Sequence, residues 1–205
     1  MAEIKLTKNE LRAQQVRLAQ LLKYLPTLHL KKAMLQAEVN EVRVTIKNLE
    51  EAYEARRAEV SDASLILSEN TGLNFTHAAQ IQEIKKRYEN IAGVDIPLFE
   101  GVTFTAFDYP LFTTPAWVDG AVVELRALAL SKAKMLVEVE KKEALERELR
   151  EISIRVNLFE KNLIPKSEEN IKKIRVFLGD QELAAVGQAK VAKKKIEHKK
   201  RGHES

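Results

Sequence analysis

The sequence contains no cysteine, which excludes disulfide bridges, thiolate metal sites and cysteine nucleophiles. Aromatic residues make up only 6% of the 205 residues, and there are just 7 glycines and 5 prolines. A compact enzyme of this length needs more turns and more aromatic bulk in its core. No apolar run reaches the roughly 18 residues of a membrane span, and the first residues lack the apolar stretch of a signal peptide. We therefore expect long helices, with no inserted segment and no thiol chemistry.

Charged residues are abundant, at 31% of the chain, and they are unevenly distributed. Residues 1–35 hold seven Lys or Arg against two Asp or Glu, and residues 161–205 hold twelve against six. The residues between them hold fifteen against twenty-two. The two ends of the chain are thus similarly basic, and a chain that folds back on itself brings them together.

The first third of the chain has a heptad pattern. Apolar residues recur in alternating steps of three and four from residue 11 to residue 60, and only Gln14, Lys32 and Arg56 interrupt them. This spacing predicts one long helix with a seam for a partner helix, a local kink at Pro26 and an end at Gly72. The central seam residues are Leu35, Val39, Val42, Ile46 and Leu49.

A second heptad pattern begins at Pro115, which we expect to be the first residue of a helix capped by Thr114. The pattern shifts phase near Lys142. Before the shift the seam residues are Leu125, Leu128, Met135 and Val139, and after it they are Leu145, Leu149, Ile152, Val156, Phe159 and Leu163. The two helices can pair antiparallel within one chain, which the matching basic ends favour, or each can pair with another copy of the chain.

The middle of the chain holds most of the helix breakers. Residues Thr76 to Gly93 have the spacing of a short amphipathic helix, and the alternation that follows predicts a β-hairpin with its turn at Glu100-Gly101. The hairpin carries more apolar side chains than two strands can bury, so we expect it to bind a partner subunit or to pack on the coiled coil. These side chains are Ile96, Phe99, Val102, Phe104, Phe107 and Phe112.

The predicted fold class is all-α: a long antiparallel two-helix coiled coil with a small middle region that contains a short helix and a β-hairpin. The expected divisions are 1–70 for the N-terminal coiled-coil helix, 71–114 for the middle region, and 115–205 for the C-terminal coiled-coil helix with its basic tail.

Three stretches of the chain resemble motifs of the D subunit of the V-type and A-type ATPases. "RVNLFEKNLIP" resembles the Arg-Val-Asn-Ala-Leu-Glu…Ile-Pro signature, "GVDIP" resembles Gly-Val-x-Val-Pro, and "KLTKNELRAQQVRLA" resembles the Pro-Thr-Lys-x-x-Leu start. The sequence departs from the family at Leu158-Phe159, where Ala-Leu is usual, and at "KLT", where a proline is common. The signature residues are Arg155, Val156, Asn157, Glu160, Ile164, Pro165, Gly93, Val94 and Pro97.

The resemblance implies a non-catalytic rotor shaft, the central stalk that couples ATP hydrolysis or synthesis to H⁺ or Na⁺ transport. The implied partners are the catalytic and regulatory nucleotide-binding subunits of the hexamer, the F subunit, and the funnel-shaped subunit over the ion-carrying ring. The implied location is cytoplasmic and peripheral, on the inner face of the membrane, with the middle segment toward the membrane. In this family the middle hairpin is associated with stimulating ATP hydrolysis. Pro165 either bends the shaft and makes it asymmetric, or is tolerated where the paired helices diverge.

Other functions have weaker support in the sequence. There is no phosphate-binding glycine loop, and His29, His77, His198 and His203 are scattered, so we expect no catalytic residues, no cofactor and no metal. The basic tail "KVAKKKIEHKKRGHES" has no aromatic residue, so a nucleic-acid partner is not expected. The tail suits the shaft tip or a disordered end better. The alternative function is a free-standing coiled-coil tether or adaptor.

Overall fold

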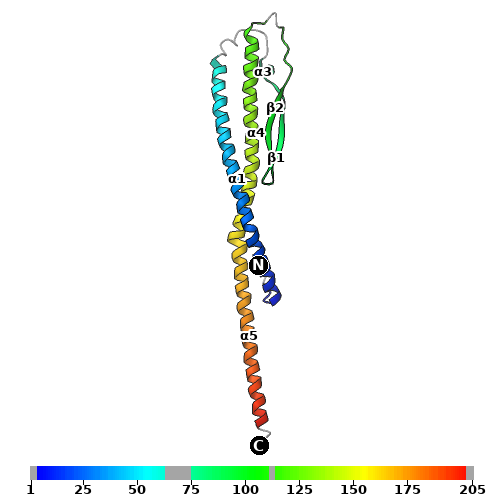
Figure 1. Ribbon diagram of the computed structural model, residues 1–205, viewed down its shortest axis with the longest axis vertical. Helices are drawn as coiled ribbons and strands as arrows, with labels where there is room; N and C mark the ends of the chain where they lie inside the picture. The colour runs from blue at the N-terminus through cyan, green and yellow to red at the C-terminus, as the bar shows by residue number, and fades with distance from the viewer. Residues whose placement is uncertain (1–3, 63–74, 111–113, 202–205) are drawn as a thin grey trace. The chain divides into compact units, whose positions relative to one another are not determined.

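The computed structural model describes residues 4–62, 75–110 and 114–201, without the side chains of 197–201. Its elements, in chain order, are α1 (Lys8–Asp62), α3 (Phe75–Ala78), β1 (Ile81–Ile91), β2 (Val94–Phe104), α4 (Trp117–Leu158), the π-helical turn η1 (Phe159–Leu163) and α5 (Ile164–Arg201) (Figure 1). The predicted fold class is confirmed, with a long helix at each end of the chain and a small antiparallel hairpin between them. None of the helices in the described ranges has the length and apolarity that crossing a membrane requires.

The chain forms two compact units, and each unit contains part of both long helical segments. Unit 1 consists of Met1–Leu30 and Ser153–Ser205, and unit 2 is Lys31–Ile152. Within each unit the helices run antiparallel. The direction in unit 1 follows from the ion pair of Lys8 with Glu182 and the hydrogen bond of His29 with Glu160, because the partner's number falls as the number on α1 rises. The ion pairs of Lys31 with Glu148 and Arg43 with Glu146 show the same direction in unit 2.

The core of unit 2 follows the heptad seam of α1. Leu35, Val39 and Val42 are almost completely buried, Ile46 is 8% exposed, and Leu49 is half-buried. Burying one such side chain contributes about 1.5–3 kcal/mol, so this stripe is a large part of what holds α1 to its partner helix. On the partner helix α4, the buried residues after the phase shift are Leu145 and Ile152.

The first half of α4 does not use the predicted seam. Leu125, Leu128, Met135 and Val139 are only half-buried, whereas the buried residues are Val118, Val122, Ala133 and Val137. The reason is that α4 is covered on more than one side here, since β1 and β2 run alongside it (Figure 1). Every residue from 125 to 131 is at least half-buried, which a helix with a single partner does not show. A single two-helix seam was therefore the wrong expectation for this stretch.

The middle region also differs from its prediction. The predicted helix from Thr76 to Gly93 is wrong, because only Phe75–Ala78 is helical and β1 follows from Ile81. The predicted turn at Glu100-Gly101 is wrong too, because both residues lie inside β2. The helical spacing arises at a bulge in β1 between Ile81 and Glu83, whereas a second register shift, between Lys85 and Lys86, places the extra residue in β2. A bulge adds one residue to a strand, so the inward-facing residues Ile81 and Ile84 are three apart instead of two.

The start of α4 differs from its prediction by two residues. The helix α4 begins at Trp117, two residues after Pro115, and the Thr114 hydroxyl donates a hydrogen bond to the Pro110 carbonyl. Such a shift of two residues is the usual uncertainty of a helix boundary. The predicted end of the first helix at Gly72 lies outside the described residues.

A small aromatic core joins α3 to the start of α4. Ala78, Val118 and Val122 are buried together, and four aromatic side chains pack against them. These are Phe75, Phe107, Tyr109 and Trp117, with Phe75 stacked on Trp117 at 5.8 Å between ring centroids. The Tyr109 hydroxyl donates a hydrogen bond to Asp119 in the first turn of α4, which raises the Tyr109 pKa above its ordinary value. The loop after β2 is thereby fixed to α4.

Candidate functional site: the docked hairpin and the helix pair around Pro165

The tip of the hairpin is a two-residue turn at Ala92-Gly93. Both residues have positive φ, 51° and 81°, as a tight hairpin turn that matches the strand twist requires. Asn90 stabilises the turn, because its Oδ1 accepts the Gly93 N–H at 3.0 Å and its Nδ2 donates to Asp95 at 2.7 Å. The signature residue Gly93 therefore has a conformational role, and Val94 and Pro97 follow it in β2.

The apolar face of the hairpin packs on α4 within unit 2. Ile96 is fully buried, and Phe99, Val102, Phe104 and Phe107 are half-buried. Lys134 lies over the Phe99 ring, at 5.7 Å from its centroid. Of the two uses that the sequence left open for these side chains, the structure shows packing on the chain's own helix. Phe112 lies outside the described residues.

Arg126 holds the base of the hairpin and α3 to α4. Its Nε donates to the Ala78 carbonyl at 2.9 Å, and its Nη2 lies 3.5 Å from the Thr105 carbonyl. The guanidinium also lies over the Phe104 ring at 5.4 Å from the centroid, where a cation–π attraction adds to the hydrogen bonds. One side chain on α4 thus contacts α3, the end of β2 and the residue after it.

The middle of the hairpin forms an ion pair with α4, and its tip lies close to a lysine of α1. Lys86 on β1 forms an ion pair with Glu140 on α4. Lys31 on α1 pairs with Glu148 at 2.9 Å, and its Nζ lies 3.5 Å from the position that a Cβ on Gly93 would occupy. The ion pair of Lys86 with Glu140 therefore holds the middle of the hairpin to α4, in addition to the contacts at its base.

The outward surface of the hairpin belongs to β1, and the sequence analysis missed it. Lys85, Arg87, Tyr88 and Glu89 are exposed, and Tyr88 is 63% exposed. An exposed aromatic ring beside an arginine is typical of a surface that contacts another protein. The only sequence signal of these residues was the polar half of a pattern with helical spacing, which pointed to the wrong secondary structure.

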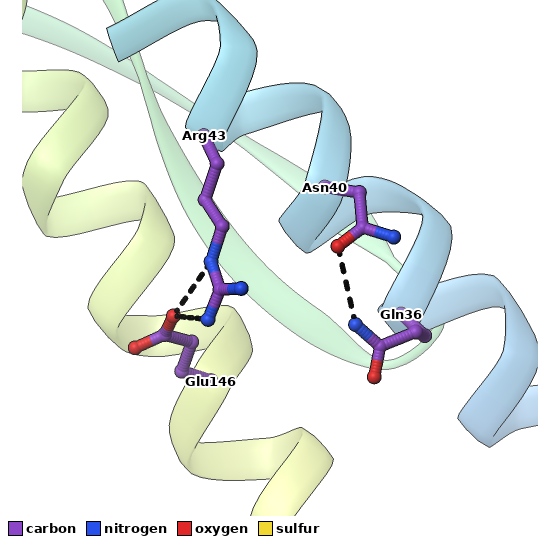
Figure 2. A network of polar contacts seen from close by, with 4 residues as sticks. All are labelled: Gln36, Asn40, Arg43 and Glu146. Atoms are coloured by element: carbon purple, nitrogen blue, oxygen red, sulfur yellow. Dashed lines mark hydrogen bonds and ion pairs between the residues drawn. The ribbon is translucent and has the colours of Figure 1, made fainter. Parts of the chain in front are cut away.

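The paired helices of unit 2 are linked by polar side chains beside the apolar seam. Arg43 donates to Glu146 Oε1 from Nη2 at 2.7 Å and from Nε at 3.3 Å, and Gln36 donates to Asn40 one turn further along α1 (Figure 2). Contacts of this kind fix the register of two helices more than they stabilise them, because exposed ion pairs contribute only about 0–1 kcal/mol.

The main signature segment lies in unit 1, where α4 passes through η1 into α5. Val156 is 2% exposed and Phe159, Leu163 and Ile164 are half-buried, so these four face α1. Arg155, Asn157 and Pro165 are exposed. Glu160 accepts a hydrogen bond from His29 Nε2 at 2.9 Å across the helix pair.

The helices do not diverge at Pro165. Ile171 and Ile174 are buried beyond it, and Ile171 lines a groove of about 470 Å³ together with Leu18 and Leu22 of α1. The interpretation that Pro165 is tolerated because the helices separate there is therefore wrong. The π-helical turn accommodates it instead, since the Ile164 N–H donates to the Phe159 carbonyl, five residues back.

The described residues contain no group of three or more His, Asp or Glu placed to hold a metal ion. Of the histidines, His29 contacts Glu160 and His77 contacts Gln80. The side chains of His198 and His203 lie outside the described part of the chain.

Comparisons with known proteins agree with the motifs. The family model of the ATP synthase D subunit matches residues 10–194. The V-type ATP synthase D subunit of Chlamydia pneumoniae is 44% identical over 207 residues, covering 98% of both chains. The proteins of the same name from Chlamydia abortus (strain DSM 27085 / S26/3) and Chlamydia trachomatis serovar L2 are 42% and 41% identical over 200 residues, covering 97% of this chain and 96% and 98% of theirs.

Proposed function

Since the chain belongs to the D-subunit family of the ATP synthases, as a subunit of a V-type ATP synthase, we propose that it is the central rotor shaft of that complex. In this role it has no catalytic residues of its own. It transmits torque between ATP hydrolysis or synthesis in the nucleotide-binding hexamer and the transport of H⁺ or Na⁺ across the membrane.

One observation carries this proposal: in both units the long helices pair antiparallel along an apolar seam, and the family match extends over both of them. A shaft must resist twisting over a long distance. A helix pair does so because apolar side chains of each helix are buried against the partner over much of its length. The α1 helix alone has 55 residues, which corresponds to about 80 Å at 1.5 Å per residue.

The exposed end of α5 supports a contact with the hexamer. All described side chains from 180 to 196 are exposed, and Lys8 at the start of α1 pairs with Glu182. Beyond this point α5 has apolar residues such as Leu183 and Ile196 that nothing in the described part of unit 1 covers. We assign this end of α5 to the catalytic and regulatory subunits, which surround it in the proposed complex.

The hairpin is the proposed element that stimulates ATP hydrolysis. Because its apolar face packs on α4, the contact with other subunits is assigned to the exposed side chains of β1, above all Arg87 and Tyr88. The F subunit and the funnel-shaped subunit over the ion-carrying ring are the other proposed partners. The whole complex would place the chain at the inner face of the membrane without inserting it.

Reconstitution tests this proposal. The full chain is mixed with purified catalytic and regulatory subunits, and the product is weighed by native mass spectrometry and assayed for ATP hydrolysis. The proposal predicts one copy of the chain per three catalytic subunits and a changed turnover rate. A chain that forms dimers by itself and leaves the hexamer unbound would instead support the tether.

A further inference from the structure

Two prolines and a π-helical turn lie at one level of the helix pair in unit 1. The hydrogen bond of His29 with Glu160 and the ion pair of Lys8 with Glu182 define the antiparallel register. Pro26 is three residues before His29, so it lies at the level of residue 163, within about one helical turn (about 5.4 Å) of Pro165. The turn η1, Phe159–Leu163, occupies the same level.

Both helices lack a backbone hydrogen bond there. Proline has no N–H, so Pro26 cannot donate to the carbonyl of Leu22, and Pro165 cannot donate to that of Lys161. Around Pro26, the Thr27 hydroxyl donates to the Tyr24 carbonyl at 2.7 Å. Just before Pro165 the backbone N–H bonds to the carbonyl five residues earlier, as in a π-helix, and not to the one four residues earlier. A helix is stiff because its backbone hydrogen bonds are continuous. The two hydrogen bonds missing at Pro26 and Pro165 therefore weaken both helices at the same level.

The core between the helices is thin at the same level. Residues 22–30 and 157–166 are all described, and none of them is fully buried. Leu21 and Val156 are buried on either side of this gap. The next two buried positions on α5 are polar, Ser167 and Asn170, so buried apolar packing resumes only at Ile171. Side-chain packing at this level comes only from half-buried residues such as Leu25, Phe159 and Leu163, so it is weaker than in the buried stretches on either side.

We propose that this level, defined as the Pro26–Pro165 joint (residues 22–30 and 157–166), is a hinge at which the helix pair of unit 1 bends or twists. The hydrogen bond between His29 and Glu160 joins the two helices at this level. The hinge goes beyond the rotor function and does not depend on it, since it is a property of the isolated chain. In a rotor it would be the level that absorbs strain.

Hydrogen exchange of the full chain tests the joint. Local opening at a weak level lets amides exchange faster there. We expect amides of the joint to exchange about tenfold faster than those of residues 170–176 of the same helix, a difference of about 1.4 kcal/mol. Pro165→Ala restores an N–H and is expected to slow exchange in residues 157–166 by about fivefold, the effect of one net hydrogen bond.

Lys166→Ala is the matched control. Lys166 is the exposed neighbour of Pro165, and lysine and alanine are both good helix formers, so this change restores no backbone bond. Amide exchange in residues 157–166 of the Lys166→Ala variant should equal that of the unmodified chain. Equal protection at the joint and in residues 170–176, or equal slowing by Pro165→Ala and Lys166→Ala, would overturn the proposal.

A distance measurement separates bending from simple fraying of the backbone. The chain has no cysteine, so spin labels at Ile154→Cys and Val176→Cys, both exposed, are the only labels. The labels are separated by 22 residues, about 33 Å of helix that includes the joint. The proposal predicts a broad distance distribution that Pro165→Ala narrows and Lys166→Ala leaves unchanged. A narrow distribution in the unmodified chain would contradict a hinge.

Discussion

Arg43 of α1 reaches Glu146 of α4 with two of its nitrogens, which both donate to the same carboxylate oxygen, at 2.7 and 3.3 Å. The two residues are 103 positions apart in the sequence, so the pair links helices that are distant along the chain. Glu146 lies four residues before Arg150, a spacing that favours a pair within one helix. The structure shows it spanning the helix pair instead, beside the buried seam (Figure 2).

A double-mutant cycle with Arg43→Ala and Glu146→Ala should give a coupling free energy of about 0.2–1 kcal/mol, because Arg43 is largely exposed. The coupling is measured from urea unfolding and should shrink at about 1 M salt, where screening is strong. The pair Lys47 and Glu51, which are neighbours on one helix at 3.8 Å, is the control and should couple less strongly. Zero coupling between Arg43 and Glu146 would show that the contact does not join the helices.

Ile152→Ala and Ile154→Ala compare two isoleucines that are two residues apart on α4. Ile152 is fully buried and Ile154 is 61% exposed. Truncating Ile152 should lower the free energy of unfolding by about 2–5 kcal/mol, since a cavity forms. Truncating Ile154 should change it by about 0.5 kcal/mol or less. Chemical denaturation followed by circular dichroism measures both, and similar losses for the two variants would mean that the seam is misplaced.

Gly93→Ala should weaken the hairpin by about 1–2 kcal/mol, because alanine is strained at a φ of 81°. An added Cβ would meet only the Lys31 Nζ at 3.5 Å, so the effect comes from the backbone and not from a clash. Gly101→Ala is the control, since a Cβ there has nothing within 4 Å and the φ is ordinary. Hydrogen exchange of the β1 and β2 amides is the measurement. Faster exchange in both variants would refute the conformational role of Gly93.

Arg126→Ala should detach α3 and the base of the hairpin from α4, with a loss of about 1.5–3 kcal/mol for hydrogen bonds from a charged donor. Trp117 is the single tryptophan and lies in the adjacent aromatic core, so its fluorescence should shift to longer wavelength as water enters. The exposed Lys132→Ala on the same helix should leave the emission unchanged. An unchanged spectrum for Arg126→Ala would show that this residue does not secure the core.

Tyr88→Ala tests the outward face of the hairpin in the assembled complex. Tyr88 is 63% exposed on β1, and Val123 on α4 is equally exposed, which makes Val123→Ala the matched control. Replacing Tyr88 should reduce ATP hydrolysis by the reconstituted complex while leaving assembly intact, because the ring contributes to binding but not to the fold. Equal rates for both variants would remove β1 from the proposed contact.

The pKa of Glu169 is lowered by its hydrogen bond from Lys173, one turn further along α5. A carboxylate whose pKa is lower in the folded chain than in the unfolded chain stabilises the fold at pH values above the unfolded pKa. This stabilisation is lost as the pH falls through the pKa of the folded chain. Both side chains are highly exposed, so the effect on stability is small. An NMR titration should show the Glu169 pKa rising in Lys173→Ala. The same pKa in both proteins would exclude the pair as its cause.

The long helices could be predicted because the heptad spacing of their apolar residues can be read from positions that are close in the sequence. A seam residue such as Val42 is buried wherever a partner helix follows the same period, and the sequence supplies that period directly. The prediction failed for the first half of α4 because the hairpin also covers this part of the helix, and a heptad pattern indicates only one partner helix. Ala133 is buried there although its small side chain gives little hydrophobic signal.

The hairpin could be predicted as an element but not located. Its strands are joined by Ala92-Gly93, whose alanine is an uncommon choice for a positive φ, so the turn lacked the usual Asn-Gly or Asp-Gly signal. The bulge in β1 between Ile81 and Glu83 then gave Ile81 and Ile84 a helical spacing. The π-helical turn before Pro165 was missed for another reason: a proline predicts a lost hydrogen bond but not how the ladder rearranges around it.

The central claim is that the chain rotates, and a single-molecule assay tests it most directly. The nucleotide-binding hexamer is fixed to a surface, the full chain carries Val123→Cys on the exposed side of α4, and a bead is attached to that cysteine, the only one in the chain. On addition of ATP the account predicts continuous rotation of the bead in one direction, which stops when ATP is exhausted. ATP hydrolysis that proceeds at full rate while the bead stays still would contradict it.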